Sequence, residues 1–167
     1  MVSFFIFSQI LAGLAFLLDL VSFQFKKREH ILFPLVFSAA LLSVHFFLLD
    51  QITASVIVFL SAVRMFLARK FVSEKMMVVF LLLNTIVLLV TFEQLVNILA
   101  FIATTLITYA NFRKDDKSLR LLMMVGTTVW IIHNALVGSP GAIIVEASFL
   151  TGNIVGYYRH YLRGRLF

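Results

Sequence analysis

The sequence predicts an all-α membrane protein, a bundle of seven transmembrane helices. Of its 167 residues, 62% are hydrophobic and 13% are charged, whereas about a quarter of the residues in a soluble domain are charged. Apolar stretches of the length that crosses a bilayer, about 20 residues, follow one another along nearly the whole chain. Lys and Arg gather in alternate connections between these stretches. Together these features leave no room for a separate soluble domain.

Charge clusters and turns divide the chain into the seven predicted helices. Their residue ranges are 4–25, 31–49, 52–68, 76–92, 95–112, 121–137 and 141–158. The boundary at residues 92–94 contains neither Gly nor Pro, but without it the stretch 76–112 is about 55 Å of helix, too long for one crossing. The N-terminus has no basic region and no small-residue cleavage pattern, so we expect it to be a retained first helix.

The basic residues predict the orientation of the bundle. Thirteen of the 14 Lys and Arg residues fall on one side: Lys26, Lys27, Arg28, Arg69, Lys70, Lys75, Arg113, Lys114, Lys117, Arg120, Arg159, Arg163 and Arg165. The connections of the other side carry no Lys or Arg, and their only charged residues are Asp50 and Glu93. By the positive-inside rule, the N-terminus lies outside and the C-terminus is cytoplasmic. We therefore expect the basic residues to set the orientation of the helices and to interact with anionic lipid, and not to bind nucleic acid.

A weak internal repeat relates the two halves of the chain. A shift of 88 residues places Ile10-Leu11-Ala12 on Ile98-Leu99-Ala100 and His45 on His133. The first three helices then match the last three. We expect two parallel three-helix repeats, 1–71 and 94–167, joined by a linker helix at 72–93. Parallel repeats with a site between them are a transporter architecture.

Two charged residues fall inside predicted helices near the basic side. Asp19 precedes Lys26 by seven residues, and Arg64 precedes Arg69 by five. Isolated charges are costly in a membrane, so we expect Asp19 and Arg64 to form an intramembrane ion pair. Such a pair would clamp helices one and three together, although a snorkelling Arg64, or an inner gate or proton site at Asp19, fits the same positions.

The last hairpin concentrates polar groups that lipid would reject. Trp130, His133 and Asn134 share one helical face, and Glu146 and Asn153 share a face of the next helix. With His45, the repeat mate of His133, they form the candidate substrate-binding set, because a carboxylate in a membrane helix needs a partner or a wet cavity. A histidine–carboxylate cluster would suit proton-linked binding. Alternatively, the two histidines form hydrogen bonds with neighbouring backbone, and one of them also satisfies the Glu146 carboxylate.

These residues also resemble known families. The pattern W-x2-H-N-x3-G-x7-E, from Trp130 to Glu146, resembles the second and third helices of the SWEET and SemiSWEET sugar transporters, in which a Trp, a Gly and an Asn lie near the sugar. Residues 22–27, S-F-Q-F-K-K, resemble the Pro-Gln segment of the wider PQ-loop superfamily. The same segment, Ser61–Arg64 and the tail from Gly141 to Arg159 resemble the YgjV-type bacterial inner-membrane protein family. The resemblance implies a SWEET-like 3+1+3 fold in the inner membrane.

We therefore expect a carrier of small polar solutes, sugar-like or otherwise, that works by alternating access. The alternative is a non-transporting inner-membrane partner or assembly protein that keeps the fold but packs its centre shut. Cysteine is absent, and neither an ordered Ser-His-Asp set nor a Gly-rich phosphate loop is present. We expect no enzyme activity, no cofactor and no metal site, with membrane lipid and an unknown small solute as partners.

Overall fold

The chain folds as seven α-helices and no other regular structure apart from one π-helical turn, within residues 2–22, 28–68, 73–112 and 115–162, which the computed structural model describes. The helices are α1 (Val2–Ser22), α2 (Arg28–Leu48), α3 (Ile52–Ala68), α4 (Glu74–Thr91), α5 (Val96–Asn111), α6 (Asp116–Leu136) and α7 (Pro140–Tyr157), and the π-helical turn spans Tyr158–Leu162. This confirms an all-helical chain of seven helices, including the boundary between α4 and α5.

The described helices are apolar enough for a membrane protein. By length and composition, three of them hold a stretch able to cross a bilayer: Ser3–Ser22, Glu74–Thr91 and Lys117–Leu136. Leu32–Leu48, Ile52–Leu67 and Val96–Asn111 are shorter apolar helices. Large apolar side chains also cover the outside, and on α4 Leu89 and Val90 are 75% and 79% exposed. A surface of this kind fits lipid and not water.

The predicted start of the sixth helix is corrected by the structure. It begins at Asp116 and not at residue 121. The Asp115 side chain caps it by accepting hydrogen bonds from the backbone N–H groups of Lys117 and Ser118. The Ser118 hydroxyl also donates to this carboxylate, and together with the two backbone bonds it holds the pKa of Asp115 below its ordinary value. A capped helix extends past its apolar part, which the span criterion alone does not detect.

Equivalent turns connect α2 to α3 and α6 to α7. Asp50 and Gly138, which are 88 positions apart, both have positive φ, 57° and 68°. In each turn this residue's N–H donates to the carbonyl three positions earlier. The next N–H donates to the carbonyl five positions earlier, at 2.9 Å in both turns. These bonds satisfy carbonyl groups at the helix C-terminus, and the left-handed residue makes the close reversal possible.

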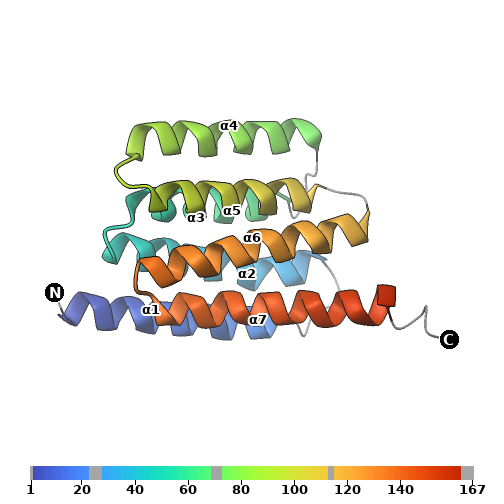
Figure 1. The fold of residues 1–167 in the computed structure, drawn as a ribbon, viewed down its shortest axis with the longest axis horizontal. Coiled ribbons are helices and arrows are strands. Elements are labelled where there is room, and N and C mark those ends of the chain that lie inside the picture. The colour runs from blue at the N-terminus through green and yellow to red at the C-terminus, as the bar shows by residue number, and fades with distance from the viewer. Residues whose placement is uncertain (1, 23–27, 69–72, 113–114, 163–167) are drawn as a thin grey trace.

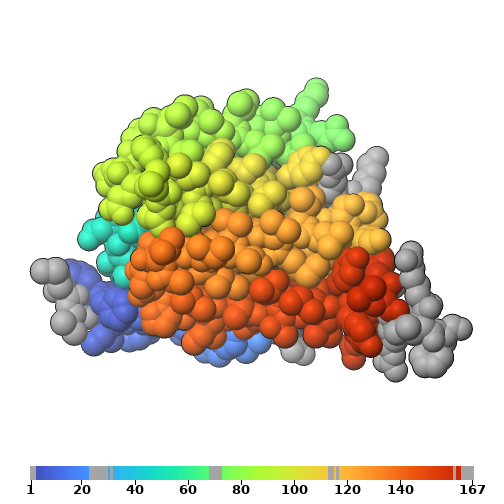
Figure 2. Space-filling view, in the orientation of Figure 1, coloured from blue at the N-terminus to red at the C-terminus, as the bar shows by residue number. Residues whose placement is uncertain are grey.

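Six of the helices form a closed ring. Going around it, α1 packs against α2, α2 against α3, α3 against α5, α5 against α6, α6 against α7, and α7 against α1. The remaining helix, α4, lies outside the ring and contacts α3 and α5 (Figure 1). In the space-filling view α4 to α7 form one continuous face (Figure 2). The ring surrounds a centre to which six helices contribute side chains.

The two ends of the bundle differ in charge. Lys75, Lys117, Arg120 and Arg159 lie where α4 and α6 begin and α7 ends, which we call the basic end. Asp50 and Glu93 lie at the opposite end, with the connections α2–α3, α4–α5 and α6–α7, which we call the turn end (Figure 1). The remaining loop and tail basic residues, except Arg28 at the start of α2, lie outside the described residues: Lys26, Lys27, Arg69, Lys70, Arg113, Lys114, Arg163 and Arg165.

The contact between α1 and α7 depends on Gly141. Its N–H donates a 2.9 Å hydrogen bond to Oε1 of Gln9, and a Cβ at this position would come within 2.9 Å of the Ala12 Cβ. Gly141→Leu is expected to lower the free energy of unfolding by about 1–3 kcal/mol, because overpacking forces the helices apart. Thermal unfolding in detergent micelles measures the change. Gly152→Leu, on the same helix but with open space at its Cβ, is the matched control, and an equal loss in both variants would contradict the argument.

Candidate functional site

The centre of the ring holds a cavity of about 230 Å³. All six ring helices line it, and α4 does not. On α5 the lining begins at Thr104 and continues to Asn111 and Phe112 at the basic end. Fourteen of the 24 lining residues are apolar, with leucine and phenylalanine the most frequent. Polar side chains also line it: Asp19, Ser38, Ser61, Arg64, Thr104, Asn111, Thr127, Asn134, Glu146 and Asn153. An apolar pocket with a few convergent polar groups is the usual form of a small-molecule site.

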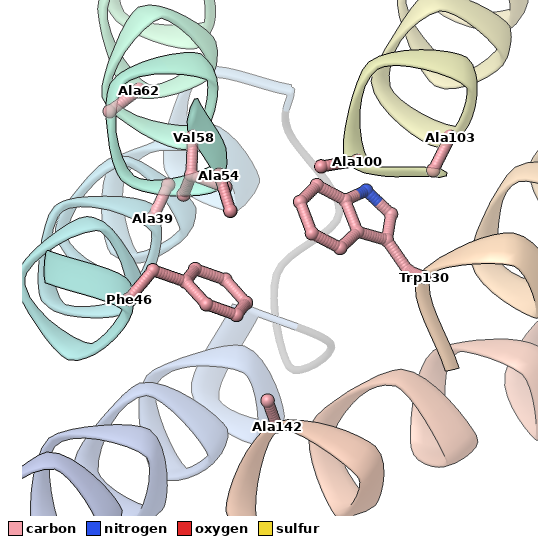
Figure 3. Close-up of a cluster of buried hydrophobic side chains, with 9 residues drawn as sticks. All are labelled: Ala39, Phe46, Ala54, Val58, Ala62, Ala100, Ala103, Trp130 and Ala142. Atoms are coloured by element: carbon pink, nitrogen blue, oxygen red, sulfur yellow. The ribbon is translucent and has the colours of Figure 1, made fainter. Parts of the chain in front are cut away.

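An aromatic pair lines the cavity toward the turn end. The rings of Phe46 on α2 and Trp130 on α6 stack with centroids 5.5 Å apart at 23°. Both side chains are almost fully buried, and they point toward each other across the ring (Figure 3). Alanines on α3, α5 and α7, Ala54, Ala100 and Ala142, pack in the same cluster. Their small size lets these helices approach the two rings closely.

Asp19 and Arg64 both face the cavity, but no ion pair joins them in the described part of the chain. Each is 4% exposed. Asp19 Oδ2 and Arg64 Nη1 are buried without a hydrogen-bond partner, and Asp19 contacts Ser38 instead. The predicted clamp between α1 and α3 is therefore corrected. Matching the depth of the two charges did not reveal that α2 packs between α1 and α3.

Glu146 lies in the cavity near Asp19. Its carboxyl group is close enough to that of Asp19 for an electrostatic interaction, which is consistent with the contact between α1 and α7. The predicted neighbours of Glu146, His45 and His133, do not line the cavity. In the described part of the chain neither histidine ring bonds to Glu146, because the ring nitrogens contact Ser8, Ser139 and Asn134 or have no partner. The predicted histidine–carboxylate cluster is therefore not formed.

The other residues predicted for the last hairpin reach the cavity. Trp130, Asn134 and Asn153 line it together with Glu146. The Nδ2 of Asn134 is buried and has no partner, while the Nδ2 of Asn153 donates to the carbonyl of Phe149, one turn earlier, at 3.0 Å. Asn134 therefore has a free donor for a bound molecule.

The two histidines pack beside the aromatic pair and do not line the cavity. Nδ1 of His45 is 2.8 Å from the Ser8 carbonyl oxygen, which can only accept, so Nδ1–H donates. Nε2 then accepts from the Ser139 hydroxyl, also at 2.8 Å. Since Ser139 caps α7, His45 ties α2 to α1 and α7. This geometry matches the structural alternative for His45.

His133 is buried differently from its repeat mate. Its ring packs edge-on against Trp130 and Phe46, Nδ1 contacts Oδ1 of Asn134 at 3.1 Å, and Nε2 has no partner. His133 therefore packs against both rings of the aromatic pair and helps to hold Trp130 in position.

The sequence reading missed Phe46 and Ser38. In the internal repeat Phe46 corresponds to Asn134, which was a predicted site residue, so the repeat offered a signal for Phe46. Nothing in the pattern of α2 marks Ser38, a common helix residue, as a neighbour of Asp19. Among the described residues, no group of three or more His, Cys, Asp or Glu side chains is arranged to hold a metal ion.

Fold and site together define a polytopic helical membrane protein with a largely apolar central cavity that polar side chains also line. Residues 6–164 match the family Imp-YgjV, described as bacterial inner membrane protein, and the chain belongs to this family. It is 31% identical over 154 residues to Inner membrane protein YgjV of Escherichia coli (strain K12), with 90% of this chain and 84% of that protein covered. The YgjV-type prediction is confirmed, as is a place in the bacterial inner membrane. No solved structure matches the chain.

Proposed function

We propose that this protein carries a small polar solute across the bacterial inner membrane by alternating access. The observation that supports this most is the cavity of about 230 Å³ at the centre of the helix ring, with buried polar atoms facing it that have no partner. Polar groups in a membrane bundle are costly to leave unpaired. A cavity of this kind is typical of a protein that holds a solute.

We also propose a SWEET-like 3+1+3 architecture, with repeats 1–71 and 94–167 and linker helix α4. Exchange of α1, α2 and α3 with α5, α6 and α7 reproduces the contacts around the ring. The equivalent turns at Asp50 and Gly138 support the same repeat. Two similar halves around a central site are suited to rocking against each other.

In this proposal the stack of Phe46 and Trp130 is the closed gate at the turn end. The cavity continues from the stack toward Asn111 at the basic end, which corresponds to an inward-facing carrier if the basic end is cytoplasmic. The alternative, a non-transporting partner or assembly protein, requires a centre that is packed shut. A cavity at Trp130 and Glu146 favours the carrier.

The experiment that tests this function is uptake into vesicles. Purified protein in liposomes is loaded with one unlabelled solute at a time, from a panel of sugars, polyols and amino acids, and entry of the labelled solute is followed. Exchange above the rate of protein-free liposomes, reduced when both Glu146 and Arg64 are neutralised, is the expected result. Absence of exchange for the whole panel, from protein that remains folded, would favour the non-transporting alternative.

We propose that the N-terminus is outside and that the basic end and the C-terminus are cytoplasmic. The separation of Lys and Arg from the turn end supports this. A periplasm-active phosphatase fused after Phe167 is expected to be inactive, while the same reporter fused after Glu93 is expected to be active. The reverse pattern would overturn the orientation, and activity of both fusions would overturn the number of crossings.

A further inference from the structure

Ionisable groups of both kinds line the central cavity from different helices, with Asp19 on α1, Glu146 on α7 and Arg64 on α3. Asp19 on α1 and Glu146 on α7 come from neighbouring helices, and their carboxyl groups interact. Arg64 comes from α3, which α2 separates from α1. The cavity therefore has a pole of two carboxyl groups and a pole with one guanidinium.

Each pole has a buried polar atom that no group of the protein satisfies. Asp19 and Arg64 are both 4% exposed, and each has a buried atom, Oδ2 and Nη1, without a hydrogen-bond partner. Buried charged groups are normally paired, because losing water without a partner is expensive. Both side chains line the cavity. A ligand that reaches both supplies the partners they lack.

The chemistry of the poles restricts this ligand. An anion satisfies Arg64 alone and is repelled by the carboxyl groups. A cation satisfies Asp19 and Glu146 alone. A neutral polyol satisfies neither charge with a charge-assisted hydrogen bond, the stronger kind. A solute that carries both an ammonium and a carboxylate fits both poles.

Size and wall composition agree with a small zwitterion. The cavity of about 230 Å³ equals the volume of roughly seven or eight liquid waters, which suits a molecule of amino-acid size. Between the poles the wall is apolar, with Leu42, Ile107 and Met123 among its residues. An aliphatic side chain on the solute has a surface to pack against.

We propose that the cavity binds a zwitterionic solute of amino-acid size, with its carboxylate on Arg64 and its ammonium between Asp19 and Glu146. This inference rests on the proposed carrier function for its biological meaning, but binding at the two poles is measured separately from transport.

The test is direct binding to the purified full-length chain in detergent micelles, by calorimetry. The probes are two amino acids, L-alanine and L-leucine, together with D-glucose. The methyl esters of the two amino acids keep only the ammonium group. The corresponding acids without the amino group, propionate and 4-methylpentanoate, keep only the carboxylate. We expect at least one of the amino acids to bind about tenfold or more tightly than both of its single-charge relatives, since each lost charge removes a charge-assisted bond.

Variants assign each charge of the solute to a pole. Arg64→Gln is expected to remove the preference for the amino acid over its ester, and Arg64→Lys to restore it in part. Asp19→Asn with Glu146→Gln is expected to remove the preference for the amino acid over its deaminated acid. Lys117→Gln and Glu74→Gln alter exposed charges at the basic end and are the matched controls, which should bind like the unmodified protein. Thermal unfolding of every variant excludes loss of fold as the cause.

The possible outcomes separate this proposal from the carrier function. Tightest binding of glucose, of an ester or of a free acid would overturn the zwitterion, and so would no binding of either amino acid. If vesicles then exchange another solute, the carrier function stands without it. Charge-selective binding of an amino acid without exchange in vesicles supports the binding site and contradicts the carrier.

Discussion

Trp130→Ala is expected to lower the free energy of unfolding by about 3–5 kcal/mol and to open the cavity toward the turn end. Trp130 is 5% exposed and stacks on Phe46, so its removal leaves a void that the alanines around it are too small to fill. Thermal unfolding in detergent measures the loss of stability. The same void joins the cavity to the region beside the histidines.

The opening itself is measurable because the chain contains no cysteine. A single cysteine is placed at Ser38 in the cavity, and a membrane-impermeant maleimide is added from the side of the turn end. Labelling is expected to be faster with Trp130→Ala than with Trp130 present. A cysteine at the exposed turn residue Asp50 is labelled in both backgrounds, and one at Lys117, exposed at the basic end, controls for probe crossing the bilayer. Equal rates at Ser38 in both backgrounds would show that the stack is not a barrier.

His45→Leu is expected to cost about 3 kcal/mol or more of folding free energy. The imidazole is fully buried and joins the Ser8 carbonyl to the Ser139 hydroxyl. Leucine fills a similar volume but leaves both partners without their bonds, and an unsatisfied buried polar group costs about 1–3 kcal/mol. Because Ser139 caps α7, the ends of α1 and α7 should loosen together.

The matched control is the same change at the repeat mate. Of its two ring nitrogens, only Nδ1 of His133 has a polar contact, with adjacent Asn134, while the buried Nε2 has no partner. His133→Leu removes this unsatisfied atom, so we expect a change within about 1 kcal/mol. Thermal unfolding of the two variants in parallel makes the comparison. A loss at residue 133 as large as at residue 45 would contradict the assignment of the structural link to His45.

Sequence periodicity and charge predicted the seven helices because each depends on local properties. Apolar length, capping residues and breaks are properties of neighbouring positions, and even the break at residues 92–94 is present in the structure. The error at the start of α6 arose because a capped, charged first turn is helical without being apolar. Apolar length, capping residues and breaks therefore predict the helices, but they miss helical turns outside the apolar segments, such as the first turn of α6.

The candidate site was predictable in part. Helical periodicity placed Trp130 and Asn134 on one face and Glu146 and Asn153 on another, and all four residues line the cavity. Counting residues along a helix gives the depth of a side chain in the membrane. Depth does not give the order of helices around the ring. The contact of α7 with α1, and the position of α2 between α1 and α3, place Glu146 near Asp19 and leave Asp19 apart from Arg64. Such neighbours depend on packing between distant segments, which a single sequence does not encode visibly.

The position of α4 makes the two junctions between the halves unequal. One junction, α3 with α5, is bridged by α4, which contacts both helices (Figure 1). The other junction, α1 with α7, has no comparable bridging helix in the described part of the chain. If the halves move relative to each other, the bridged junction is the natural hinge and the unbridged one the edge that widens. Asp19 and Glu146 lie along that edge, so the strength of their mutual repulsion would set how readily it parts sideways into the lipid.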